Sequence, residues 1–61
     1  RNSNKDFARF LEIAIGSAYE VETQLLISSD LGFITEENTI ELANLLEEII
    51  KMTSRFRATL L

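Results

Sequence analysis

The sequence contains no cysteine and no histidine, so it lacks the side chains that form disulfides and the common zinc sites. It has no proline, and its only glycines are Gly16 and Gly32. A chain of 61 residues buries only about 60% of its unfolded surface. Domains this small usually need a disulfide, a metal or association to be stable. The remaining means of stabilisation is association with further helices, in other copies or in more of the same polypeptide.

Acidic residues outnumber basic ones by ten to six, giving a formal net charge of −4. Surfaces that bind nucleic acid or anionic membranes carry clustered lysine and arginine, so this balance disfavours both partners. No apolar run approaches the roughly 18 residues of a membrane-spanning helix, and no signal peptide is recognisable, which predicts a cytoplasmic protein. The chain begins at Arg1 and its first residues resemble the interior of a helical protein, so we interpret it as part of a longer polypeptide.

Residues from about 4 to 29 have the periodicity of an amphipathic helix. Ser3 is placed to cap its N-terminus, with Asp6 three positions later as in a capping box. Apolar residues then recur at alternating steps of four and three, which places them in one stripe at about 100° per residue. Flanking apolar residues widen the stripe, as expected of a helix with two neighbours. The stripe comprises Phe7, Leu11, Ala14, Ala18, Val21 and Leu25.

A turn is predicted at about residues 30–35, where Gly32 can adopt the positive φ of a residue that follows a helix. Thr35 is suited to cap a second helix over about residues 36–60, and the helix dipole favours Glu36 and Glu37 in its first turn. Arg57 complements the dipole at the other end. The apolar face of this helix comprises Leu42, Leu45, Leu46, Ile49, Met52, Phe56 and Leu60.

Two long helices joined by a short connection pack as an antiparallel helical hairpin, so the predicted fold is all-α. One hairpin covers only part of the apolar arc of each helix. We therefore expect further helices to close the core.

The residue runs 1–7, 10–17, 20–26 and 30–34 resemble a known family, and the string GSAYEVETQLL at residues 16–26 is the most specific. The chain is similar to the bacterial four-helix-bundle family of 23S rRNA intervening-sequence proteins, also labelled S23 ribosomal protein. The second helix matches it more loosely. The resemblance spans nearly all of these residues but only the C-terminal half of a typical member.

The resemblance implies that the hairpin is the second half of an up-and-down four-helix bundle. It also implies a ring-like homo-oligomer, since members of the family are reported as pentamers, and the ribosomal label implies no ribosomal role. A related group, the accessory proteins of diversity-generating retroelements, is basic and binds nucleic acid beside a reverse transcriptase. This acidic segment departs from that group.

The candidate contacts between helices or subunits are Gly16, Ser17, Glu20, Glu22 and Gln24 of the first helix. Gly16 costs about 1 kcal/mol relative to alanine inside a helix, so with Ser17 it indicates close helix packing; cradling a ligand is the weaker alternative. Glu22 falls inside the apolar arc, so it should be paired, protonated or at the rim. We expect Glu22 or Glu20 to meet an Arg or Asn from other helices or a neighbouring subunit, and a partly solvated rim position is the alternative. A more polar surface, which either joins subunits or is ordinary exposed surface, carries Ile13, Glu20 and Gln24.

Catalysis, cofactors, metals and small-molecule ligands have no candidate residues. Histidine and cysteine are absent as bases and nucleophiles, and a di-iron bundle needs Glu-x-x-His pairs. Glu20 and Glu22 point about 160° apart on a helix, which is unsuited to a shared site. The leading hypothesis is a non-enzymatic assembly protein. The alternatives are an RNA- or DNA-binding accessory protein with basic residues elsewhere, and a coiled-coil or antitoxin-like module in a heteromeric complex.

Overall fold

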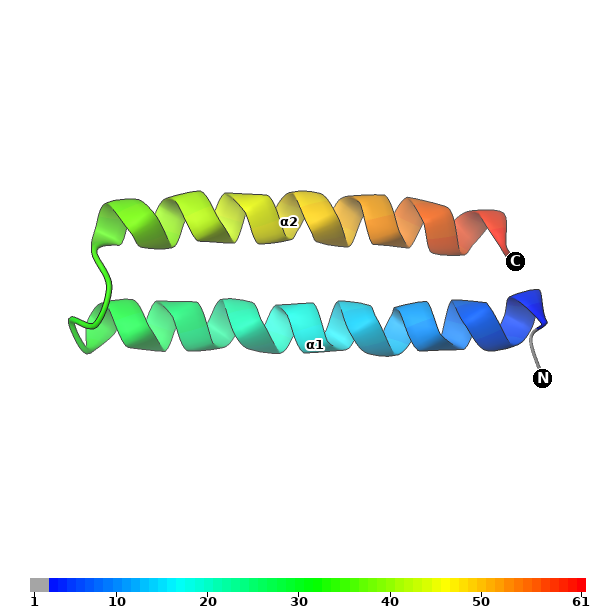
Figure 1. Ribbon diagram of the computed structural model, residues 1–61, viewed down its shortest axis with the longest axis horizontal. Coiled ribbons are helices and arrows are strands. Elements are labelled where there is room, and N and C mark those ends of the chain that lie inside the picture. The colour runs from blue at the N-terminus through cyan, green and yellow to red at the C-terminus, as the bar shows by residue number, and fades with distance from the viewer. Residues whose placement is uncertain (1–2) are drawn as a thin grey trace.

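The computed structural model describes residues 3–61 and consists of two α-helices joined by a short turn (Figure 1). Helix α1 spans Asn4–Asp30 and helix α2 spans Glu36–Thr59. The helices run antiparallel along a length of 44 Å, so the start of α1 lies beside the end of α2 (Figure 1). The predicted all-α helical hairpin is thereby confirmed.

Each helix is preceded by a residue whose side chain accepts a hydrogen bond from a free backbone N–H group. The Oγ of Ser3 accepts from the backbone N–H of Asp6 at 3.0 Å. The Oγ1 of Thr35 accepts from the backbone N–H of Asn38, also at 3.0 Å. Each bond satisfies a donor that has no partner within its helix, which is why these residue types stand at these positions.

The turn ends α1 through a pair of backbone hydrogen bonds around Gly32. The N–H of Phe33 donates to the carbonyl of Ser28 at 2.9 Å, and the N–H of Gly32 donates to that of Ser29 at 3.0 Å. Together these bonds form a Schellman motif, in which the residue after the helix adopts positive φ. Gly32 has a φ of 82°, which side chains with a Cβ rarely adopt.

The two helices meet along a seam in which buried and half-buried residues recur at steps of three and four. This heptad spacing keeps one face of each helix against the other. Ala8, with 1% of its surface exposed, and Ile50, with 5%, form the apolar core among residues 3–61. The seam comprises Ala8, Leu11, Ile15, Ala18, Glu22 and Leu25 of α1, Thr39, Ala43, Leu46, Ile50, Thr53 and Arg57 of α2, and Leu60, which directly follows α2.

The seam uses only one edge of the apolar arc predicted for each helix. Phe7 and Val21, both in the predicted stripe of α1, remain 44% and 46% exposed, whereas Ala8 and Ile15 face α2. On α2 the buried residues are Thr39 and Ile50, which lie next to the predicted stripe. An arc broad enough for two neighbours fixes no single contact direction, so the sequence did not determine which edge closes the hairpin.

Candidate assembly surface

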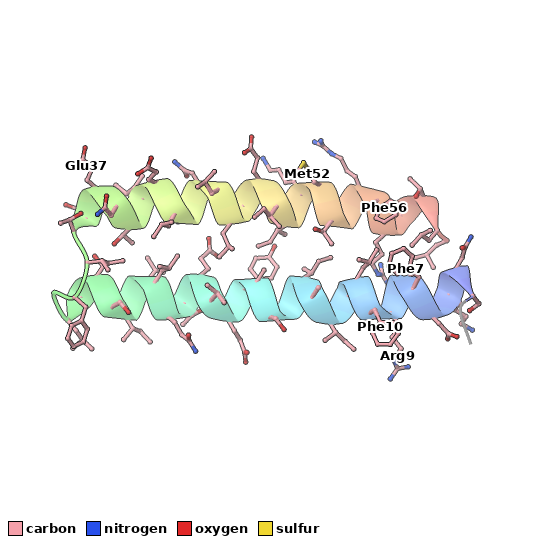
Figure 2. The ribbon with its side chains drawn as sticks, in the orientation of Figure 1. Phe7, Arg9, Phe10, Glu37, Met52 and Phe56 are labelled. Carbon is pink, nitrogen blue, oxygen red and sulfur yellow. The ribbon has the colours of Figure 1, made fainter. Side chains whose placement is uncertain are left out.

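An apolar face remains uncovered along one side of the hairpin. Phe7 of α1 and Phe56 of α2 mark one end of it, where their rings meet edge to face with centroids 5.6 Å apart (Figure 2). Residues seven apart repeat the same face of a helix, so two rows continue from this pair along the hairpin. The rows are Phe7, Ala14 and Val21 on α1, and Phe56, Met52, Ile49, Leu45 and Leu42 on α2.

The large side chains of this face are between 44% and 58% exposed. At 100° per residue, every charged side chain of the two described helices falls outside the arc that carries the two rows. Single exposed apolar residues are ordinary, but a contiguous uncharged patch marks a surface that another molecule or segment covers. This open apolar face is therefore the candidate functional surface.

Arg57 ties the end of α2 to the start of α1. Its Nε donates a hydrogen bond to the carbonyl of Ala8 at 3.1 Å, and its Nη2 lies 3.6 Å from Oε1 of Glu12. The side chain is about two-thirds buried in the seam. The sequence indicated a role for Arg57 toward the dipole of α2, and the structure adds a bond to the opposite helix, which depends on how the helices pack.

Glu22 lies half-buried in the seam and faces another acid, Glu47 of α2. The hydrogen bond between the two carboxyl groups, partial burial and repulsion by Glu47 together raise the pKa of Glu22 above its ordinary value. The hairpin thus supplies Glu22 with a carboxyl partner. An Arg or Asn contributed by other helices remains a prediction.

The other candidate contacts of α1 point away from α2. Ser17, Glu20 and Gln24 are exposed, and a Cβ added at Gly16 would meet nothing within 4 Å. The hairpin itself therefore brings none of these four residues against another helix. The prediction that they form packing or subunit contacts concerns helices outside the hairpin.

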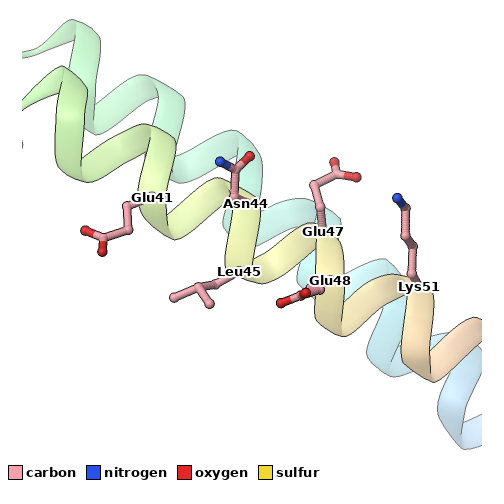
Figure 3. Close-up of a pocket in the computed structure, with 6 residues that line it drawn as sticks. All are labelled: Glu41, Asn44, Leu45, Glu47, Glu48 and Lys51. Carbon is pink, nitrogen blue, oxygen red and sulfur yellow. The ribbon is translucent and has the colours of Figure 1, made fainter.

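A shallow hollow runs along the outer surface of α2, lined by Glu41, Asn44, Leu45, Glu47, Glu48 and Lys51 (Figure 3). All six side chains come from one helix, so they cannot enclose a small molecule as a pocket between elements does. Within residues 3–61, no three metal-ligating side chains gather closely enough to hold an ion.

Neither helix in the described part of the chain combines the length and the apolar character needed to cross a membrane.

A sequence model described as 23S rRNA-intervening sequence protein matches residues 1–55. The chain belongs to this family. The match covers all of α1, the turn and most of α2, and so it confirms the resemblance drawn from the sequence. The description of the 23S rRNA-intervening sequence protein family names no reaction. Comparisons with curated proteins and with solved structures gave no match.

Proposed function

We propose that this chain is a non-enzymatic assembly module whose open apolar face packs against two further helices and completes a four-helix bundle. From such bundles a ring-like homo-oligomer is built, with five subunits as the family resemblance implies. The observation that carries the proposal is the uncharged face defined by Phe7 and Val21 on α1 and by Leu42, Ile49 and Phe56 on α2.

The exposed area of the hairpin supports this proposal. A folded monomer of 6.9 kDa exposes roughly 4,000 Å² by the usual scaling of area with mass. This hairpin exposes 4967 Å², and within residues 3–61 no large side chain is fully buried. Burying apolar surface contributes about 25 cal/mol per Å², so covering the open face supplies the core that the hairpin lacks.

The arrangement of layers supports it as well. Stable domains pack at least two layers of secondary structure around one core. The hairpin is 11 Å across its shortest axis, which is about the diameter of one helix. It is therefore one layer, and two further helices on the open face would supply the second.

The alternative function, an RNA- or DNA-binding accessory role, receives less support. Phosphate binding requires an excess of lysine and arginine over acids on the contacting surface. This segment carries the opposite excess, with a net charge of −4. Assembly through the apolar face accounts for the observed surface without such a partner.

The proposal is tested by placing an acid in the open face and, as a matched control, on the other side of the same helix. Ile49 and Ile40 are 50% and 56% exposed, so neither substitution disturbs a buried side chain of the hairpin. Ile49→Asp is expected to abolish association and lower helix content, whereas Ile40→Asp retains both. Sedimentation equilibrium and circular dichroism measure the two properties. A wild-type chain that is monomeric and fully helical would overturn the proposal.

A further inference from the structure

The hairpin has a second side, opposite the open apolar face, which we call the back face. Each residue in the rows of the open face comes directly before a seam residue, as Val21 comes before Glu22 and Ile49 before Ile50. A residue that comes directly after a seam residue is turned by about 100° in the opposite sense, and so it points toward the back face. The back face therefore stays exposed when further helices cover the open face.

Three exposed apolar side chains of the back face surround a pair of carboxyl groups. Tyr19, Leu26 and Ile40 each follow a seam residue and are 50%, 54% and 56% exposed. The contacts at the far end of the seam set a register that places Leu26 at the level of Ile40 and Tyr19 at the level of Glu47. Between these levels, the carboxyl group of Glu47 meets that of Glu22. We call these five residues the back patch.

The back patch lies in the acidic half of the molecule. Residues 17–48, which form the half that contains the turn, carry eight acids and no lysine or arginine. The nearest base along α2 is Lys51, four residues after Glu47 and on the same side of the helix (Figure 3). Among residues 3–61, however, the one ion pair joins Arg57 to Glu12. The two carboxyl groups of the patch therefore have each other as partners and no cation.

We propose that the back patch binds a segment of a separate protein that carries an arginine between apolar side chains. The arginine lies against Glu22 and Glu47, and its apolar neighbours pack on Leu26 and Ile40. A guanidinium group presents five N–H donors in a planar fork, which suits adjacent carboxyl oxygens, and it also stacks on aromatic rings such as that of Tyr19. The inference goes beyond the proposed function, because it concerns a surface that the bundle leaves uncovered.

Charge favours a separate protein over a neighbouring subunit as the occupant of the back patch. Subunits of a cyclic ring that pack side by side bring equivalent halves next to one another. A subunit contact through the back patch would therefore press the acidic half of one hairpin toward the acidic half of the next, which repulsion between like charges disfavours. A basic segment of another protein neutralises the same carboxyl groups.

The mixed composition of the patch also suits recognition of arginine. Tyrosine and arginine are enriched among the residues that contribute most to binding at protein interfaces. Apolar side chains that pack around an ion pair exclude water from it, and the attraction between the charges is stronger where water is excluded. Tyr19, Leu26 and Ile40 border the carboxyl pair from both helices and supply such surroundings when a partner covers them.

The test compares two synthetic helical peptides that differ in one side chain. Both carry leucines on either side of a central residue, which is arginine in one peptide and citrulline, an uncharged side chain of the same shape, in the other. Fluorescence anisotropy with the full chain at low salt measures both dissociation constants. The arginine peptide is expected to bind roughly tenfold more tightly. Any binding of the leucines to other apolar surface is common to the two peptides and does not contribute to this ratio.

Variants of the chain locate the arginine on its surface. Glu47→Gln removes a carboxylate of the back patch, whereas the control Glu20→Gln removes one from the side of α1 that points away from α2. Both positions are exposed and both variants change the net charge equally. Glu47→Gln is expected to lose most of the preference for the arginine peptide, and Glu20→Gln to retain it. Tyr19→Leu keeps an apolar side chain and is expected to reduce the preference by about threefold through loss of the ring.

Failure of this inference is distinguishable from failure of the proposed function. Equal affinities for the two peptides, or the same preference in Glu47→Gln as in Glu20→Gln, overturn the back patch as an arginine site and leave assembly through the open face in place. Sedimentation equilibrium of Glu47→Gln is expected to give the wild-type number of subunits. A changed number would assign the back patch to a subunit contact and overturn a separate protein as its occupant.

Discussion

Glu22 and Glu47 place two carboxyl groups together across the seam, which makes the stability of the hairpin depend on pH. Because the pKa of Glu22 is raised in the folded chain above its ordinary value of 4.5, the folded state binds more protons than the unfolded state at mildly acidic pH. The free energy of unfolding therefore falls as the pH rises through this range and levels off once Glu22 is ionised in both states.

The variant Glu22→Gln removes this titration and retains an amide that can donate to Glu47. We expect it to be more stable than the wild type at pH 7 and to lose less stability than the wild type between pH 4.5 and pH 7. Urea unfolding followed by circular dichroism at both pH values measures this. Glu48→Gln, on the exposed surface of α2, is the control and should leave the wild-type pH dependence unchanged. Equal pH dependence in Glu22→Gln and wild type would refute the role of the pair.

The partners of single residues across the seam depend on how the two helices are rotated relative to each other. Helix periodicity alone placed Glu22 in the apolar arc. Its partner Glu47 lies on the other helix, and finding it requires the relative rotation of α1 and α2, which the broad arcs leave open. The bond from Arg57 to the carbonyl of Ala8 depends on the same rotation.

The helix ends and the turn depend on local signals, and for that reason the sequence indicated them well. Ser3 and Thr35 accept the hydrogen bonds expected of capping residues, and Gly32 has the expected positive φ. Each of these features involves residues within five positions of one another. The position of the seam within each broad arc is a property of the pair of helices, and no local signal encodes it.

Substitution by alanine is expected to have opposite effects on stability at the two glycines. Gly32→Ala places a Cβ at a φ of 82° and is expected to destabilise the chain by about 1 kcal/mol. Gly16→Ala adds a Cβ in open space within α1 and is expected to stabilise it by about 0.5–1 kcal/mol. Thermal and urea unfolding measure both changes. Destabilisation by Gly16→Ala would instead show that another helix approaches Gly16, as the sequence predicts.

At the scale of the whole molecule, a net charge conceals where charges lie. The value of −4 disfavours a nucleic-acid surface, yet it combines Arg1 with two halves of opposite charge: residues 17–48 carry eight acids and no base, whereas residues 3–16 and 49–61 carry five bases and two acids. The basic residues form one half of the molecule only because the turn brings residues 49–61 alongside residues 3–16. In the folded hairpin, acidic residues therefore gather toward the end that contains the turn, basic residues gather toward the other end, and one side is apolar.

Such a molecule is expected to gain stability with concentration. If folding of the hairpin is completed by association, the associated state is favoured by mass action, and the melting temperature rises with the amount of chain. We expect a rise of several degrees between about 5 and 500 μM in melts followed by circular dichroism. Each tenfold step in concentration changes the free energy of association by about 1.4 kcal/mol for each partner bound. Domains this small shift by several degrees per kcal/mol.

The variant Ile49→Asp separates this effect from intrinsic hairpin stability. Its side chain lies in the open face and makes little contribution to the seam, in which the neighbouring Ile50 is buried. We expect the melting temperature of Ile49→Asp to be low and independent of concentration, since a chain that cannot associate unfolds as a monomer. A wild-type melting temperature that stayed constant over a hundredfold range would mean that one layer of two helices is stable alone, in conflict with the small core of residues 3–61.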